Sequence, residues 1–147
     1  MLKTLPAKEF ERMLKKRYEY VYQMSAKWQK IGLTALVTPF WQHCAPKAKD
    51  VGEQGLMGEY SFIWNTTGFP AGIMPITAVE ANEQTFTDDY KDKYTGILNS
   101  NAEGSEGMPI SIQIVGHAYE DEKVLGVMKA LESKVDYKIP MPPVIKK

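Results

Sequence analysis

The chain has 147 residues, of which 44% are hydrophobic and 24% are charged, and this composition suits one globular domain over residues 1–147. Eighteen basic residues balance eighteen acidic ones, so no net positive field attracts nucleic acid, and we expect no nucleic-acid partner. Cys44 is the only cysteine, which excludes an internal disulfide framework and suits a reducing, intracellular compartment.

The sequence predicts no membrane-spanning segment. Its longest apolar run, around Leu33 to Trp41, is far shorter than the ~20 residues that cross a bilayer. The basic N-terminal stretch is interrupted by Glu9, Glu11 and Glu19, which favours a solvated helix face over an organelle-targeting helix. Peripheral contact of Lys15-Lys16-Arg17 with lipid head groups stays open, although a plain surface is the simpler interpretation.

The first predicted element is a long amphipathic helix from about residue 7 to 31, which Gly32 can close. Its apolar face is defined by residues at three- or four-residue steps: Phe10, Leu14, Tyr18, Val21, Ser25, Trp28 and Ile31. Residues 33–38 then predict a short buried strand that ends before Pro39.

The middle of the chain predicts a connecting loop over residues 43–55 and a short helix over 56–67, stopped by Gly68 and Pro70. Residues 73–79 and 110–115 are apolar on both faces and predict two strands covered by helices on both sides. The polar segment 80–107 lies between them, and we expect its 99–107 tract to move and to stay outside the core.

A last helix is indicated by an apolar face with helical spacing, made of Val124, Leu125, Met128, Leu131 and Val135. Acidic Glu120, Asp121 and Glu122 begin it, at the end where the helix dipole is positive. Three prolines predict an extended tail over 138–147. The order of helices and apolar strands is typical of an α/β layered fold.

Two stretches of the chain carry a family resemblance. They are Trp64-Asn65-Thr66-Thr67-Gly68-Phe69-Pro70-Ala71-Gly72-Ile73-Met74-Pro75 and Gly107-Met108-Pro109-Ile110-Ser111-Ile112-Gln113-Ile114-Val115-Gly116. With the acidic start of the last helix, they resemble the C-terminal part of the amidase signature family, closest to the fatty acid amide hydrolases. The resemblance covers roughly residues 10–137 and implies part of a mixed sheet, about three strands, flanked by helices. The family usually has glycine where Ser111 stands, which suggests relaxed packing or lost function there.

Catalysis in that family implies a serine nucleophile, a relay serine, a lysine base and a Gly-Gly-Ser-Ser-Gly-Gly-type loop that supplies backbone donors. This chain has no Gly-Gly pair. None of its serines lies in a Gly-x-Ser-x-Gly elbow; they are Ser25, Ser61, Ser100, Ser105, Ser111 and Ser133. We therefore predict no catalytic, cofactor-binding or metal-binding residues, and a chain that is not itself an enzyme.

Three other groups of residues have competing interpretations. His43-Cys44 with His117 could form a nucleophilic pair or bind a metal, but ordinary half-buried residues are favoured. The run Asp88-Asp89-Tyr90-Lys91-Asp92-Lys93 lacks the ligand spacing of a calcium loop and indicates a solvated face. The aromatic set of Phe40, Trp41, Tyr60, Phe62 and Trp64 could line an acyl channel, although core packing is favoured.

Strands that are apolar on both faces need more sheet and more helical cover than three strands provide, so a partner should cover the open edge. The first hypothesis is a non-catalytic, amidase-derived subunit of a larger protein assembly, by analogy a mitochondrial respiratory-chain complex. The alternative is one piece of a split fatty acid amide hydrolase whose partner chain carries the Ser-Ser-Lys set. A freestanding lipid-binding module is a third.

Overall fold

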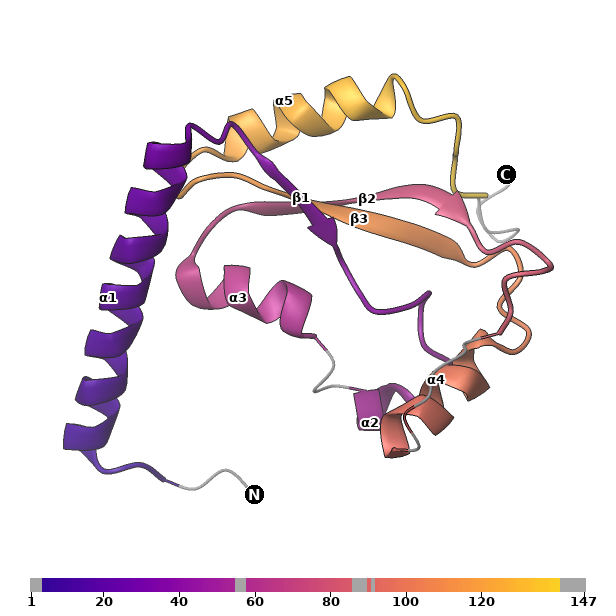
Figure 1. Ribbon diagram of the computed structural model, residues 1–147, viewed down its shortest axis with the longest axis horizontal. Coiled ribbons are helices and arrows are strands. Elements are labelled where there is room, and N and C mark those ends of the chain that lie inside the picture. Colours follow the sequence, from indigo (N-terminus) through magenta and orange to yellow (C-terminus); the bar gives the residue numbers. More distant parts are fainter. Residues whose placement is uncertain (1–3, 55–57, 86–89, 91, 141–147) are drawn as a thin grey trace, which may run out of the picture.

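The computed structural model describes residues 4–54, 58–85, 90 and 92–140. Its elements are α1 (Ala7–Ile31), β1 (Leu36–Pro39), α2 (Val51–Gln54), α3 (Glu59–Thr67), β2 (Ala71–Ala78), α4 (Lys93–Ala102), β3 (Pro109–Val115) and α5 (Asp121–Glu132). Figure 1 shows the sheet with α5 along one face, α3 on the other and α1 at one end. This is the α/β arrangement that the sequence predicts.

The sheet has three strands in the order β1-β3-β2, and β3 is antiparallel to both neighbours. The expected number of strands is confirmed, but both pairings are antiparallel in place of the mixed pattern that the resemblance implies. β3 is hydrogen-bonded on both sides, and Ile114 and Val115 in it are fully buried. Because neighbouring side chains of a strand point to opposite faces, these two residues anchor the two sides of the sheet.

On one face of the sheet, α5 packs against Met74 of β2 and Ile114 of β3 through Val124. A β-carbon at Gly72 would collide with Met128 of α5, so the missing side chain lets the helix approach β2 closely. The last helix is therefore where the sequence predicts it, and Val124, Met128 and Leu131 of its predicted apolar face belong to the core. Leu125 corrects the prediction, because it is 63% exposed, and Val135 packs against the core from beyond the end of the helix.

The opposite face carries a second core cluster of Trp28, Trp64, Phe69 and Val115. Trp28 stands at the end of α1, where its indole Nε1 donates to the carbonyl of Leu33 at 2.8 Å. Leu33 thus belongs to the helix end, which explains why β1 spans Leu36–Pro39 and not residues 33–38. Pro39 is the last residue of this edge strand, one residue beyond the predicted end, because an edge position tolerates a residue without an N–H.

The sequence prediction that residues 73–79 are covered on both faces is wrong for β2, and the predicted burial of the first strand is wrong at Val37 of β1, which is 52% exposed. Ile73 pairs with Gln113 and so shares its face, yet Ile73 is 47% exposed. The helix on this face, α3, is tied to β3 by the Gln113 amide and to Phe40, the residue after β1, by the Ser61 hydroxyl. β2 therefore has an apolar side chain, Ile73, that the described residues leave partly exposed.

The long N-terminal helix has the expected bounds, Ala7–Ile31, and Gly32 ends it in the left-handed conformation at φ 75°. Only part of its predicted apolar face is packed: Trp28 is buried and Val21 lies against the core, beside Met24, which the prediction did not include. Ile31, at the end of the predicted face, is 69% exposed. Tyr18 and Phe10 are 63% and 53% exposed. None of the helices in the described ranges is both long and apolar enough to span a bilayer.

The polar tract 99–107 corrects another expectation, because part of it is core. Asn101, at the end of α4, is 1% exposed; its Oδ1 accepts from the backbone N–H of Lys47 at 2.7 Å and its Nδ2 donates to Ile97 O at 2.9 Å. The Lys47 ammonium donates to the carbonyls of Ser100 and Glu103, which closes the end of the helix. Asn101 can therefore be buried although it is polar, because its side-chain hydrogen bonds are made within the protein.

The remaining segments add smaller corrections. The predicted 43–55 loop contains the short helix α2. The start of the predicted 56–67 helix lies outside the described residues, as do Asp88, Asp89 and Lys91 of the charged run. Asp92 accepts from the N–H of Thr95 at 2.8 Å as the N-cap of α4, and this bond lowers the pKa of its carboxyl. Residues 138–140 form neither helix nor strand, and 141–147 lie outside the described residues.

We predict that Gly116→Ala destabilises the fold by about 1–3 kcal/mol, because the added β-carbon would lie 2.5 Å from Cγ2 of the buried, stiff Val124. Urea unfolding measures the change. Gly96→Ala is the matched control, since nothing lies within 4 Å of its added carbon and alanine favours the helix. Adding Val124→Ala to Gly116→Ala should make the cost of the glycine change smaller; an undiminished cost would contradict the steric account.

We also predict that Asn101→Ala costs about 1–3 kcal/mol and frays the end of α4, because the Lys47 N–H loses its buried acceptor. Hydrogen exchange at the amide of Lys47 should accelerate with the fall in unfolding midpoint. Asn99→Ala, on the exposed side of the same helix, should leave both unchanged. Equal effects of the two substitutions would mean that the tract is not core.

Candidate functional site

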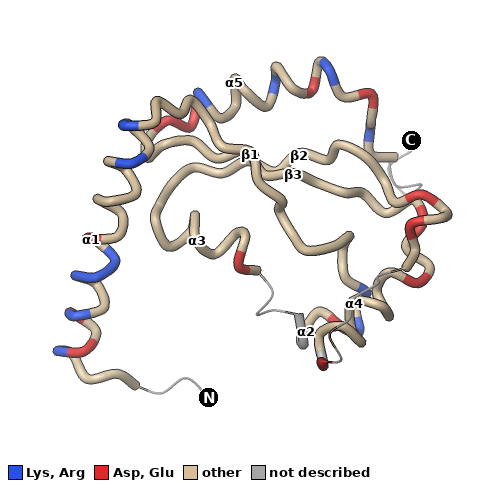
Figure 2. Tube along the Cα trace, viewed as in Figure 1, with Lys and Arg blue, Asp and Glu red and all other residues tan. Residues whose placement is uncertain are grey.

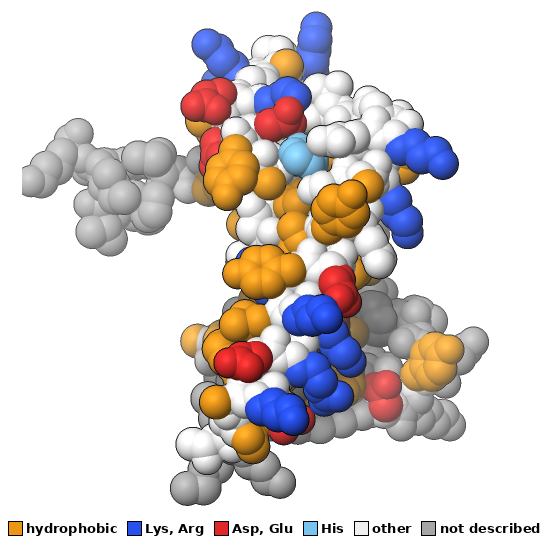
Figure 3. All heavy atoms as spheres, turned by 90° about the vertical axis from the view of Figure 1, so that its left-hand side faces the viewer, with side chains coloured by type: hydrophobic (Ala, Val, Ile, Leu, Met, Phe, Trp, Pro, Cys, Tyr) orange, Lys and Arg blue, Asp and Glu red, His pale blue; other side chains and the backbone are white. Residues whose placement is uncertain are grey.

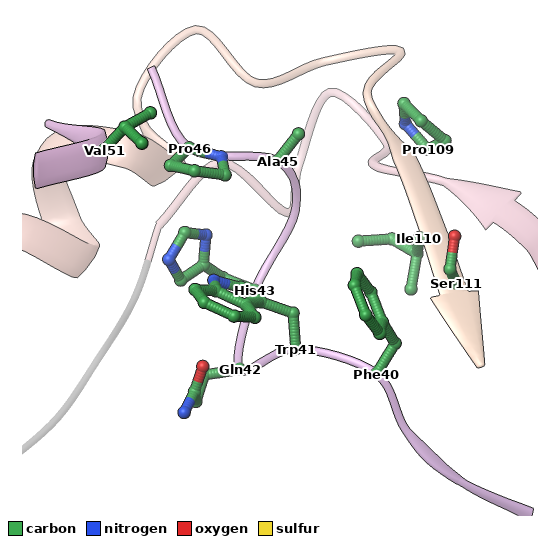
Figure 4. A pocket seen from close by; sticks show the side chains of 10 residues that line it. All are labelled: Phe40, Trp41, Gln42, His43, Ala45, Pro46, Val51, Pro109, Ile110 and Ser111. Carbon is green, nitrogen blue, oxygen red and sulfur yellow. The ribbon is translucent and has the colours of Figure 1, made fainter. Parts of the chain in front are cut away.

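A cavity of about 450 Å³ lies between the segment that follows β1 and the beginning of β3. Its walls are Phe40, Trp41, Gln42, His43, Ala45, Pro46, Val51, Pro109, Ile110 and Ser111 (Figure 4). Most of these side chains are apolar, and the volume is in the range of small-molecule sites. The arrangement suits an apolar group and not a strongly charged one.

The aromatic set singled out in the sequence is divided by the fold. Phe40 and Trp41 line the cavity with ring centroids 6.1 Å apart. Trp64 belongs to the core, as expected, whereas Tyr60 and Phe62 are 44% and 48% exposed. The sequence could not separate these roles, because Tyr60, Phe62 and Trp64 lie on one short helix, α3. The helix directs Trp64 to the core and leaves the other two side chains partly exposed to solvent.

The cavity wall also offers a few polar groups. Ser111 stands at the position where the resemblance implies glycine, and Figure 4 shows its hydroxyl beside Ile110 and Pro109. The indole Nε1 of Trp41 is buried and has no acceptor among the described residues. An apolar molecule with one hydrogen-bond acceptor would match this wall.

Gln113 fixes the geometry beside the cavity. It is 3% exposed, and its Nε2 donates to the carbonyl of Tyr60 at 3.0 Å and to Thr38 Oγ1 at 3.2 Å. One buried amide on β3 thus ties the start of α3 and the edge strand β1 to the central strand. Ser61 adds a second tie, since its hydroxyl donates to the carbonyl of Phe40 at 3.1 Å.

The motif residues quoted in the sequence have structural roles of the same kind. Gly107 turns at φ 79° and donates to Val79 O at 2.9 Å, which closes the β2–β3 connection. The N–H of Gly116 donates to the carbonyl of Pro70 at 2.9 Å at the other end of the same strand pair. Phe69 is buried between Trp28 and Trp64. The two motif stretches are therefore one strand pair with its turns and its core anchor.

The histidines and the cysteine do not form one site. His43 lines the cavity and Cys44 is buried, whereas the Nε2 of His117 lies 3.0 Å from Ser25 Oγ. The ring of His117 packs beside Phe69 and Trp28, away from the cavity residues. This serine–histidine contact joins residues 92 apart in sequence, so local spacing gives no signal for it. It connects α1 to the segment before α5.

No group of three or more His, Cys, Asp or Glu side chains within the described ranges is arranged to hold a metal ion. Each of Ser61, Ser105 and Ser133 donates its hydroxyl to a backbone carbonyl. Among the described residues, no serine hydroxyl is hydrogen-bonded to a lysine ammonium. The site is thus an apolar cavity beside a hydrogen-bonded scaffold.

The family model for amidases matches residues 2–125, which is most of the chain. The chain belongs to the amidase family. It is 32% identical over 104 residues to fatty acid amide hydrolase 1 of Caenorhabditis elegans, covering 69% of this chain and 17% of that protein. It is 26% identical over 120 residues to fatty-acid amide hydrolase 1 of Sus scrofa, covering 77% of this chain and 20% of that protein.

A solved fatty acid amide hydrolase has the same fold over 94% of this amidase-family chain, with a TM-score of 0.77 and 18% identity. The match covers 25% of that structure. The family and the fold that the motifs indicate are therefore confirmed. The chain spans about a fifth of the length of the curated relatives it matches.

We predict that Gln113→Glu lowers the free energy of unfolding by about 1–3 kcal/mol, because a carboxylate cannot donate to the carbonyl of Tyr60. Urea unfolding measures the loss, and hydrogen exchange over α3 should report local loosening. Gln29→Glu makes the same chemical change at an exposed position of α1 and should be nearly neutral. Equal stability of the two variants would show that the hydrogen bonds of Gln113 do not hold α3 and β1 to β3.

Proposed function

We propose that this chain is a non-catalytic, amidase-derived accessory subunit that serves as a structural part of a larger protein assembly. The observation that supports the proposal is the uncovered apolar surface. Phe10 and Met13 on α1 and Ile73 on β2 are each close to half exposed. Burying one such side chain is worth roughly 1.5–3 kcal/mol, so a protein partner that covers several of them gains substantial binding energy.

The chemistry of the described residues agrees with a structural role. Catalysis in the family is implied to need two serines and a lysine, and the hydroxyls of Ser61, Ser105 and Ser133 are committed to backbone carbonyls. The motif residues close turns and seat helices on strands. These are contacts that preserve a fold, and they persist when selection for hydrolysis is relaxed.

For the compartment, we propose a mitochondrial assembly, by analogy with large complexes that recruit relatives of enzymes. The balanced formal charge of the chain fits a protein-bound subunit better than one bound to nucleic acid. Separation of organelles followed by immunodetection of the chain tests the compartment independently of the partner.

A second candidate is supported by the apolar cavity behind Phe40, Trp41 and Ile110. If the chain is one piece of a split amide hydrolase, these residues would line a substrate pocket while another polypeptide supplies the serines and the lysine. This function requires hydrolysis of fatty amides by the assembled complex and not by this chain alone.

The deciding experiment is a mild native purification of the tagged chain from its own cells, with mass spectrometry of the co-purified proteins and an oleamide hydrolysis assay on the same fraction. We expect a large assembly without an amidase partner and no hydrolysis above background. Hydrolysis by a fraction that contains a Ser-Ser-Lys amidase chain would favour the split enzyme. Recovery of the chain alone as a soluble monomer would overturn the accessory function.

A further inference from the structure

The side of α1 that points away from the core is strongly basic. The inward side of the helix is marked by Val21, Met24 and Trp28, which pack in the core. Successive residues of an α-helix are turned by about 100°, and this rotation gives the residues that lie opposite the inward side. The charged residues in that outward third of the helix are all exposed, and five are basic against one acidic: Lys8, Arg12, Lys15, Lys16, Lys30 and Glu19. We call this surface the basic face.

The charges of the basic face are not neutralised by the described part of the chain. Arg12 lies 3.7 Å from Glu9, but the two side chains are 66% and 45% exposed, so the pair contributes little. No carboxylate of the described residues forms an ion pair with Lys8, Lys15 or Lys16. Along the face, Arg12 has a basic neighbour four residues away in each direction, and such like charges repel. An anionic surface would relieve this repulsion.

The opposite end of the molecule is acidic. The connections at the ends of β2 and β3 that lie remote from α1 carry four exposed acids (Figures 1 and 2): Glu80, Glu83, Glu103 and Glu106. Residues 79–85 and 103–108 include no lysine or arginine. The balanced formal charge of the chain therefore hides a separation of charge along the molecule. In front of a negatively charged surface, such a molecule turns α1 toward the surface.

Tyrosines border the basic face. Tyr18 and Tyr22 lie on one flank and are 63% and 77% exposed, and Tyr20 lies on the other flank and is 45% exposed. Figure 3 views the molecule from the α1 end and shows basic side chains gathered over the lower part of this face, with large hydrophobic side chains beside and above them. A tyrosine combines an apolar ring with a polar hydroxyl, which suits the boundary between water and lipid.

The length and straightness of the basic face favour a lipid surface over other anions. At about 1.5 Å per residue, Lys8 and Lys30 are roughly 33 Å apart along the axis of one helix. An acidic protein would need a row of carboxylates of the same length, whereas anionic head groups form a continuous plane. A nucleic-acid duplex makes roughly one turn over this distance, so each of its phosphate strands crosses the row only once.

We infer that the basic face of α1, from Lys8 to Lys30, is a docking surface for a membrane that contains anionic phospholipids. The helix lies along the membrane, and its ammonium and guanidinium groups contact the anionic head groups. Tyr18 and Tyr22 reach the boundary of the apolar layer. This inference goes beyond the proposed accessory function, because Phe10 and Ile73, which are offered to a protein partner, lie outside the basic face.

Flotation of the full-length chain with lipid vesicles tests the docking surface. We expect vesicles of phosphatidylcholine and phosphatidylserine in equal parts to bind the chain roughly ten-fold or more tighter than phosphatidylcholine alone. Binding should fall when the ionic strength is raised from about 0.1 M to about 1 M, because exposed charges are then screened. Equal binding to both kinds of vesicle would overturn the inference. Binding to polyglutamate or to duplex DNA as tight as to the anionic vesicles would overturn its assignment to lipid.

Charge-reversal variants locate the contact. Lys8→Glu with Lys15→Glu should weaken binding to the anionic vesicles by roughly ten-fold or more. Lys129→Glu with Lys134→Glu is the matched control, because it changes the net charge equally at exposed positions near the end of α5 that is remote from α1 (Figure 1). Equal losses in the two variants would show that net charge and not the basic face decides binding, and would overturn the inference.

A neutral pair keeps the test valid if charge reversal disturbs the fold. Lys15→Gln with Lys16→Gln retains good helix formers and should give a smaller but measurable loss of binding. Circular dichroism that matches the unmodified chain establishes that α1 is retained. Unchanged vesicle binding by this folded variant would contradict the docking surface.

The outcomes separate this inference from the proposed function. Native purification of the Lys8→Glu, Lys15→Glu chain should recover the same protein assembly, because the apolar side chains offered to a partner are unaltered. Vesicle binding by a chain that is recovered from cells without any partner would support the docking surface and remove the accessory function. An intact assembly whose chain does not bind anionic vesicles would do the reverse.

Discussion

The structure depends on β3, a seven-residue strand that is hydrogen-bonded on both sides and covered on both faces. Ile114 holds α5, and the next residue, Val115, holds the aromatic cluster in which α1 ends. Because adjacent side chains of a strand point to opposite faces, one dipeptide joins the two layers. A shift of β3 by one residue would exchange Gln113 with Ile114 and place an amide in the α5 core. The register of this strand therefore fixes the rest of the fold.

Local features of the sequence were sufficient for most of the elements. The bounds of α1 follow from an apolar repeat that ends at Gly32, and the bounds of α3 and β3 follow from Gly68 and from a run of apolar residues before Gly116. These signals lie within a few residues of the structure that they specify. The family motifs then added the approximate number of strands, whereas the order β1-β3-β2 and its antiparallel pairing are seen only in the structure.

The features that the sequence did not reveal are all non-local. The buried Oδ1 of Asn101 accepts from the backbone N–H of Lys47, more than fifty residues away, and Ser25 meets His117 across the fold. The cavity likewise combines the segment after β1 with the start of β3. Because such residues are polar, the sequence alone suggests that they are exposed. Only the three-dimensional fold shows that they form hydrogen bonds with distant parts of the chain. The open faces of α1 and β2 were missed for the complementary reason, since periodicity shows that a face is apolar without showing what covers it.

Both edges of the sheet carry a proline. Pro39 lies in β1 and Pro75 lies in β2, where the register shifts before Thr77. A residue without an N–H interrupts the ladder that an incoming strand would need, and a bulge twists the edge away from it. The chain can thus expose apolar surface without offering a continuous template for strand addition. Such an edge resists open-ended, amyloid-like association through strand addition, even though apolar side chains beside it are exposed.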